Sequence, residues 1–184
     1  GPGTGLGGAT LQWIDGHAVA RNSEPGHAGL SPATELEIEV FKLLLPEHGN
    51  IYAELLVSGA GLARLYQAIS RVNGTDPEQL SPAEVSERAL RGENPLCVSA
   101  LETFCALLGS ACGDFILSNG AYGGLFIAGG IVPRMTSFLQ HSQFLTRMRS
   151  KGAMTELLES IPVQIITEPY PGLIGAAHAP LQEA

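Results

Sequence analysis

Five glycines stand among the first eight residues, in the run Gly1-Pro2-Gly3-Thr4-Gly5-Leu6-Gly7-Gly8. Because no Cβ shields the backbone there, its N–H groups can approach an anion, and Thr4 adds a hydroxyl donor. The run therefore predicts a phosphate-binding loop. It also satisfies the dinucleotide pattern G-x-G-x-x-G, but that pattern requires a strand before the loop and a helix after it.

The segment after the glycine run predicts a β-hairpin instead of a helix. Residues 9–14 form an alternating, strand-like segment, Asp15-Gly16 is a turn pair, and residues 17–22 form a second short strand. The loop also lacks the Lys-Ser/Thr pair of a Walker A motif. A glycine loop that leads into a hairpin argues against a Rossmann fold and for a different way of holding phosphates.

The totals of the chain describe an ordinary globular domain. Its 184 residues, 45% of them hydrophobic and 15% charged, suffice for one domain with a substantial core. The formal net charge of −8 argues against a surface for nucleic acid or anionic membranes. Binding of ATP remains compatible with this charge, because backbone dipoles and Mg²⁺ handle the phosphates locally.

The cysteines and the apolar segments indicate in which cellular compartment to expect the protein and whether it spans a membrane. Cys97, Cys105 and Cys112 are odd in number and lack C-x-x-C spacing, so neither a disulfide framework nor a zinc site fits. We expect buried free thiols in a reducing cytoplasm. The most apolar window, residues 96–117, contains two carboxylates with only eleven uncharged residues between them, which is too short to span a bilayer. No signal peptide is visible, and a chain that starts without Met inside a functional loop suggests a piece of a larger protein.

Strands alternate with helices along the chain, which predicts an α/β fold with a mixed sheet, because the hairpin is antiparallel. Ser31-Pro32 predicts a helix over 32–45 that Pro46 and Gly49 close. Gly109 and Gly113 are expected to let a long apolar helix pack closely on the sheet. The other expected elements are helices over 59–72, 82–91, from 95 onward, in part over 138–149, over 154–159 and over 172–182, a buried strand over 125–128 and a strand over 163–167.

Glu24 and His27 flank the turn Pro25-Gly26 and form a candidate polar site. A carboxylate and an imidazole on one turn can bind vicinal hydroxyls, since each hydroxyl both donates and accepts hydrogen bonds. The same residues also fit a surface turn whose polar side chains face water.

Two further positions are candidates for binding. Glu54 interrupts an apolar run over 51–57, where a buried carboxylate must be paired or hydrogen-bonded, although it also fits a strand end that reaches solvent. Gly129-Gly130 follow a predicted strand, where glycines open a crevice for ligands or make a tight turn. Together with the first loop they suggest a two-sided nucleotide clamp. The residues alone do not identify the second ligand.

Several motifs together resemble the bacterial-type glucokinases, members of the actin and hexokinase superfamily. Residues 1–7 resemble the second phosphate motif of that family, and residues 23–27 resemble its E-G-G-H sugar turn. Residues 53–62 are similar to the segment that carries a further sugar-binding glutamate. Residues 126–134 resemble the adenosine motif, and residues 171–177 the closing helix. These motifs follow the order and the spacing of the family over nearly the whole chain.

The resemblance implies an actin-like ATPase (ribonuclease H-like) domain over residues 1–184. It implies phosphorylation of the 6-hydroxyl of glucose, the first step of glycolysis, with ATP and Mg²⁺, and such transfer depends mainly on positioning and charge neutralisation. The residues that it assigns to ATP are Gly3, Thr4, Gly5, Gly129 and Gly130, and those that it assigns to glucose are Glu24, His27 and Glu54.

The chain departs from the family pattern in two ways. Pro25 replaces the first glycine of the sugar turn, which fixes φ and removes a donor, so the turn must differ if the family needs a positive φ there. The catalytic aspartate of the family belongs to an upstream small lobe, so the resemblance places no catalytic residue and no metal ligand in this chain. We therefore expect the larger carboxyl-terminal lobe, inactive alone, with the amino-terminal lobe as its partner.

Two alternatives remain open at this point. The fold also suits a non-catalytic sugar sensor or regulatory protein, because a fold does not fix a function. A kinase for another hexose is the second, since glucose and mannose differ in the orientation of one hydroxyl. Members of the family often dimerise, so a homodimer is compatible with the sequence, whereas no nucleic acid or membrane partner is expected.

Overall fold

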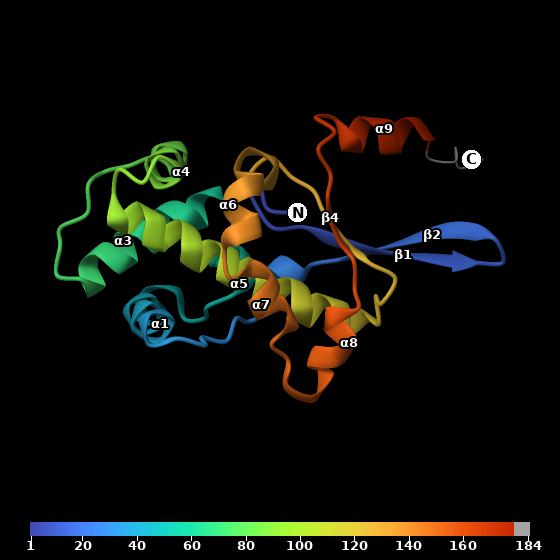
Figure 1. Cartoon of the computed structure of the whole chain (residues 1–184), viewed down its shortest axis with the longest axis horizontal. Coiled ribbons are helices and arrows are strands. Elements are labelled where there is room, and N and C mark those ends of the chain that lie inside the picture. Colours follow the sequence, from blue (N-terminus) through green and yellow to red (C-terminus); the bar gives the residue numbers. More distant parts are fainter. Residues whose placement is uncertain (179–184) are drawn as a thin grey trace.

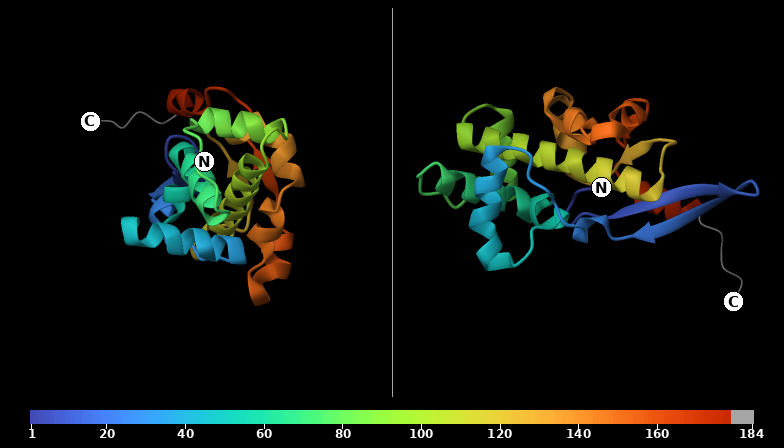
Figure 2. Two further views of the ribbon diagram at one scale, coloured as in Figure 1. Left: turned by 90° about the vertical axis from the view of Figure 1, so that its left-hand side faces the viewer. Right: turned by 90° about the horizontal axis from the view of Figure 1, so that it is seen from below.

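The computed structural model describes residues 1–178, and Figure 1 shows an α/β chain. The predicted hairpin is present: β1 (Gly8–Ile14) pairs with β2 (His17–Ser23) in antiparallel register. Asp15 and Gly16 turn the chain with φ of 50° and 80°, in the left-handed region that these residue types tolerate. The right-hand view of Figure 2 shows that the hairpin extends away from the central group of helices around the long helix over 95–119.

The long helix α5 (Pro95–Asn119) forms the centre of the helical part and packs against α3 (Gly59–Val72), α4 (Pro82–Leu90) and α7 (Phe144–Arg149). We expected this segment to be too short to span a bilayer. By length and composition alone, the helix is in fact long and apolar enough to do so. However, 67% of its most apolar window is buried inside the protein. It is therefore placed as a core helix. Its three cysteines are free thiols, as predicted; Cys97 and Cys105 are buried as expected, whereas Cys112 is only half-buried.

Two glycines of α5 pack against α7 and not against a sheet as expected. A Cβ on Gly109 would collide with the backbone carbonyl of Phe144, and one on Gly113 would collide with that of Met148. The absence of side chains at these positions lets the two helix backbones approach each other.

The helix α1 (Glu35–His48) begins three residues later than predicted and continues through Pro46. Thr34 is its N-cap, because the Thr34 hydroxyl accepts a hydrogen bond from the Glu37 N–H at 3.2 Å. Pro46 lies in the last turn, where it removes one intrahelical hydrogen bond without ending the helix. The helix ends only before Gly49, whose φ is 69°.

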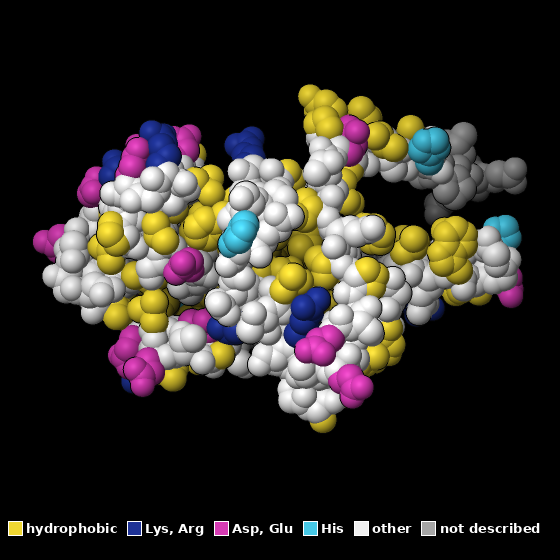
Figure 3. Space-filling view, in the orientation of Figure 1, with side chains coloured by type: hydrophobic (Ala, Val, Ile, Leu, Met, Phe, Trp, Pro, Cys, Tyr) yellow, Lys and Arg dark blue, Asp and Glu magenta, His cyan; other side chains and the backbone are white. Residues whose placement is uncertain are grey.

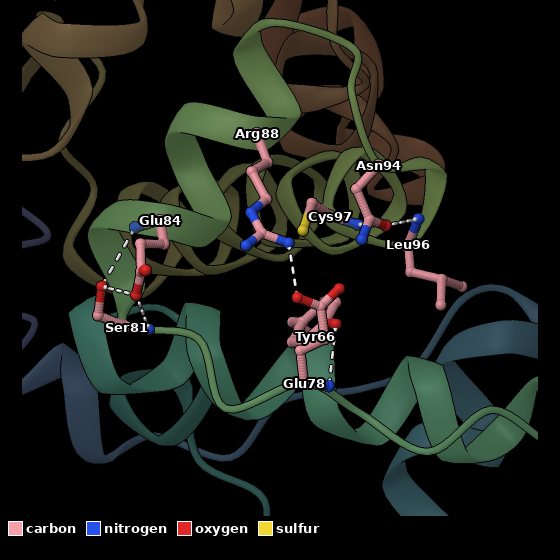
Figure 4. A network of polar contacts seen from close by, with 8 residues as sticks. All are labelled: Tyr66, Glu78, Ser81, Glu84, Arg88, Asn94, Leu96 and Cys97. Atoms are coloured by element: carbon pink, nitrogen blue, oxygen red, sulfur yellow. Dashed lines mark hydrogen bonds and ion pairs between the residues drawn. The ribbon is translucent and has the colours of Figure 1, made fainter.

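A polar network connects α3, the following loop and α4 (Figure 4). Ser81 and Glu84 form a capping box: the Glu84 N–H donates to Ser81 Oγ at 3.3 Å, and the Ser81 N–H donates to Glu84 Oε2 at 2.8 Å. Arg88 donates to Glu78 Oε2 at 2.8 Å. The Glu78 N–H in turn donates to the hydroxyl of the buried Tyr66 at 3.3 Å. These contacts fix α4 over α3.

The strands β3 (Leu125–Ile127) and β4 (Val163–Ile165) form a second, parallel sheet. Within residues 1–178 it shares no ladder with the hairpin, so the structure shows two separate two-stranded sheets where one mixed sheet was expected. The expectation of a buried strand over 125–128 is confirmed only in part. Ile127 is buried, but Phe126 is 64% exposed, because successive residues of a strand point to opposite faces.

The remaining elements are short. Within the apolar run over 51–57, residues 53–56 form a short helix. Residues 179–182 of the helix predicted over 172–182 lie outside the described residues. Figure 1 shows that the last helix stands apart from the helical body. The remaining short helices are α2 (Ala53–Leu56), α6 (Thr136–His141), α8 (Thr155–Glu159) and α9 (Pro171–His178), and the 3₁₀ turns are Pro25–His27, Val132–Met135 and Gly152–Met154.

Candidate functional site

The glycine run forms a compact loop in front of β1. The Gly3 N–H donates to the carbonyl of Gly5 at 2.8 Å, and the Gly59 N–H at the start of α3 donates to the carbonyl of Gly3 at 2.9 Å. Thr4 is exposed at the tip of this loop. The backbone of the loop is therefore tied to α3, while its hydroxyl donor faces solvent.

The structure brings the second glycine segment against the first. Gly129 has φ of 100°, and a Cβ there would collide with the carbonyl of Pro2. A Cβ on Gly1 would lie 2.6 Å from the carbonyl of Ala128. Gly130 is exposed, with no atom within 4 Å of the place that a Cβ would take. The two glycine segments, more than a hundred residues apart in the sequence, thus lie next to each other.

Glu24 and His27 lie at the two ends of a 3₁₀ turn. Glu24 Oε2 is 4.0 Å from His27 Nδ1, and the side chains are 81% and 63% exposed. The His27 ring stacks on Tyr52 with centroids 5.6 Å apart and an interplanar angle of 5°. Pro25 occupies the first position of the turn, where the φ of proline fits without strain. The replacement of glycine at this position is therefore compatible with the observed turn.

Glu54 connects the glycine loop with this turn. Its Oε2 accepts a hydrogen bond from the Leu6 N–H at 2.7 Å, and the side chain is half-buried. A Cβ on Gly5 would lie 2.5 Å from the same oxygen, and one on Gly26 would lie 3.3 Å from the Glu54 Cβ. Of the two alternatives for Glu54, the structure thus shows the hydrogen-bonded carboxylate.

An apolar cavity of about 490 Å³ lies beside the loop, lined by residues of β1, α5 and β3. Glu24, His27 and Glu54 do not line it. Cys112 does, and burial raises the pKa of its thiol to about 12, so the thiol stays protonated near neutral pH. The cavity is therefore an apolar cleft next to the polar candidates and separate from them.

Two features of the site were not predicted from the sequence. Tyr52 supports the His27 ring, and the Leu6 N–H binds Glu54, although 48 positions separate these two residues. For the stacking on His27, the sequence offered one local indication, namely that the aromatic Tyr52 lies two positions before the candidate residue Glu54. Within residues 1–178, no cluster of three or more His, Cys, Asp or Glu side chains is placed to hold a metal ion.

The α/β structure of the chain matches the actin-like ATPase fold of solved sugar kinases. It superposes on the glucokinase of Balamuthia mandrillaris, solved in complex with glucose, with a TM-score of 0.73 over 91% of this chain and 49% of that chain. The two sequences are 21% identical. At this level of identity the likeness concerns the fold alone.

The chain belongs to the glucokinase family, whose model matches residues 1–183. The glucokinase of Saccharophagus degradans is 41% identical to it over 177 residues, which are 96% of this chain and 55% of that protein. The crystal structure of a glucokinase from an Antarctic psychrotroph has a TM-score of 0.89 at 42% identity and covers 96% of this chain and 55% of its own. The chain thus spans about half the length of the relatives that it matches.

Proposed function

We propose that this chain is the large lobe of a glucokinase and that the whole protein transfers the γ-phosphoryl group of ATP to the 6-hydroxyl of D-glucose. The observation that carries the proposal is the position of Glu54, which contacts the glycine loop on one side and the sugar turn on the other. A predicted phosphate site and a predicted hydroxyl site therefore adjoin within a member of the glucokinase family. The sensor alternative is not favoured, because the relatives at 38% to 45% identity bear the name glucokinase.

The two glycine segments fit the nucleotide. The space beside Gly3 and beside Gly130 is open, so phosphates and adenosine can approach the backbone at these positions. Thr4 and Gly5 contact the transferring phosphate in this proposal, and Gly129 keeps the second segment against the first. Bound Mg²⁺ neutralises charge on the triphosphate. Oxygen ligands for this ion would come from the phosphates and water, as is usual for Mg²⁺.

The polar turn and α2 bind the sugar in this proposal. Glu24 and Glu54 accept hydrogen bonds from glucose hydroxyls, and the His27 ring, held by Tyr52, adds a further polar partner. Glu24 and His27 are exposed in this chain. A second lobe that closes over them would exclude water and bring its catalytic aspartate to the 6-hydroxyl. The isolated chain is then inactive.

We also propose how the two sheets are joined in the whole protein. β1 and β3 both line the apolar cleft, and large apolar side chains are exposed beside it, with Leu11 62% and Phe126 64% exposed. An extended segment from the rest of the protein would pair with both strands and bury these side chains. Since β1–β2 is antiparallel and β3–β4 is parallel, the result is the expected mixed sheet. A cytoplasmic location and a homodimer remain predictions.

The test is kinase activity of the whole protein with variants of the sugar site. We expect Glu24→Ala and Glu54→Ala each to lower kcat/KM for glucose by about 30- to 1,000-fold, since carboxylates that bind hydroxyls contribute about 2–4 kcal/mol of discrimination. Glu39→Ala is the control, because Glu39 lies on α1 and, among residues 1–178, forms an ion pair only with the exposed Lys42. Near-normal turnover in both site variants would remove the sugar assignment. Parallel assays with mannose and fructose decide which hexose is preferred.

A further inference from the structure

The two oxygens of the Glu54 carboxylate have different surroundings. Oε2 accepts the Leu6 N–H at 2.7 Å and lies against Gly5. Oε1 accepts no hydrogen bond from any residue of the described range 1–178. One oxygen is therefore committed to the glycine loop, and the other is free for a ligand.

The loop that Glu54 holds is otherwise fixed by backbone contacts and by the buried side chain of Leu6, which packs in the hydrophobic core. The Gly59 N–H binds the carbonyl of Gly3, and Gly26 packs against the carbonyl of Leu6 so closely that a Cβ would not fit. Glu54 is the one side chain that binds a backbone N–H of residues 1–7 among the described residues. Its carboxylate thus fixes the middle of the loop, next to Thr4 and Gly5.

We propose that Glu54 is a positioning residue for the phosphate loop in addition to a ligand of the sugar, so that occupation of the sugar site and the geometry of the loop depend on each other. This inference rests on the proposed function for the identity of the two ligands. A hydroxyl bound to Oε1 orients the same carboxylate that holds the Leu6 N–H. By linkage, a sugar that orders this group tightens nucleotide binding, and a nucleotide tightens sugar binding by the same factor.

The experiment compares two glutamates of the sugar site in the whole protein. Glu54→Ala removes the bond to the loop, Glu54→Gln keeps an acceptor oxygen at the same reach, and Glu24→Ala removes a sugar ligand for which no hydrogen bond to the loop is present. Hydrogen exchange of the Leu6 amide is measured without any ligand. The dissociation constant of ADP is measured by calorimetry with and without glucose.

We expect the Leu6 amide to exchange about tenfold faster or more in Glu54→Ala, because a hydrogen bond to a charged acceptor is lost. Glu54→Gln should give an intermediate rate and Glu24→Ala the wild-type rate. ADP should bind several-fold more weakly to Glu54→Ala even without glucose, whereas Glu24→Ala should leave that constant unchanged.

Wild-type exchange at Leu6 and wild-type ADP affinity in Glu54→Ala would overturn the inference, even if glucose turnover falls. If Glu54→Ala does not fold, Glu54→Gln decides in the same way, since an unchanged Leu6 rate and unchanged ADP affinity contradict the inference. Failure of the proposed function looks different: the wild-type protein would not phosphorylate glucose, while the exchange of Leu6 would still respond to Glu54.

Discussion

At the scale of single residues, the contact between α5 and α7 depends on a glycine. A Cβ on Gly109 would collide with the carbonyl of Phe144, which belongs to the backbone of α7 and cannot rotate away as a side chain can. Alanine at a helical position gains about 1 kcal/mol over glycine in propensity. The collision opposes this gain, because overpacking a core costs about 1–3 kcal/mol.

The overpacking cost less the gain in propensity leads us to expect that Gly109→Ala lowers the free energy of unfolding by up to about 2 kcal/mol, measured by urea denaturation with far-UV circular dichroism. Gly123→Ala is the matched control. No atom lies within 4 Å of its Cβ position and its φ is not positive, so its stability should stay near that of the wild type. A Gly109 variant as stable as this control would mean that α7 shifts at little cost.

The site residues show what a sequence can and cannot reveal at this scale. Glu54 stood out because a carboxylate inside an apolar run must be paired or hydrogen-bonded, and Glu24 and His27 stood out because a carboxylate and an imidazole on one turn can bind vicinal hydroxyls. The bond from the Leu6 N–H to Glu54 could not be predicted, since no periodicity connects positions 48 residues apart. Motifs thus identified the side chains, and the fold was needed to show which of them meet.

At the scale of elements, α1 and α7 are joined by a buried ion pair. Arg147 Nη1 donates to Glu37 Oε1 at 2.6 Å and Nη2 to Oε2 at 3.1 Å, and the Glu37 side chain is 3% exposed. The Ala33 N–H also donates to Glu37 Oε2 at 2.7 Å, just before α1 begins. Glu37 thus fixes both the start of its helix and its docking on α7.

We expect Glu37→Gln to lower the free energy of unfolding by about 3 kcal/mol or more, because it leaves the charge of Arg147 buried without its counterion. Glu39→Gln on the same helix is the control. Glu39 also forms an ion pair, at 2.7 Å with Lys42, but both side chains are more than half exposed, so its loss should cost less than about 1 kcal/mol. If urea denaturation gave the same loss of unfolding free energy for both variants, burial would not make the Glu37–Arg147 pair more important for stability than the Glu39–Lys42 pair.

The elements themselves were largely predictable where their signals are local. The hairpin turn and the capping box of α4 depend on residues within four positions of each other, and both are present. The start of α1 was misplaced because Ser31-Pro32 and Thr34 both carry N-cap signals, and only packing through Glu37 selects the second. The packing partner of Gly109 was also misassigned. A glycine in a helix indicates that another backbone packs closely against it, but the sequence does not show whether that backbone belongs to a sheet or to α7.

At the scale of the whole molecule, the two small sheets are the feature that local signals do not explain. A two-stranded hairpin is marginal in water without further strands or a covering helix. β1 exposes Leu11 and Trp13, and Figure 3 shows apolar side chains along the hairpin and over α9. Such surfaces mark places where other parts of a protein pack. The proposed extended segment between β1 and β3 would account for the cleft and for the exposed side chains around it.

This proposal predicts a pattern of amide exchange that distinguishes it from a simple docking of lobes. If a strand pairs with β1 and β3, amides of Gly8–Ile14 and Leu125–Ile127 that face the cleft gain partners and exchange about tenfold more slowly or more in the whole protein than in the 184-residue chain. The strand β2 is the internal control, because its ladder with β1 is already complete in this chain. A lobe that only covers the cleft would bury Phe126 without pairing the strand edges, so equal exchange of the β1 and β3 amides in both proteins would contradict the joined sheet.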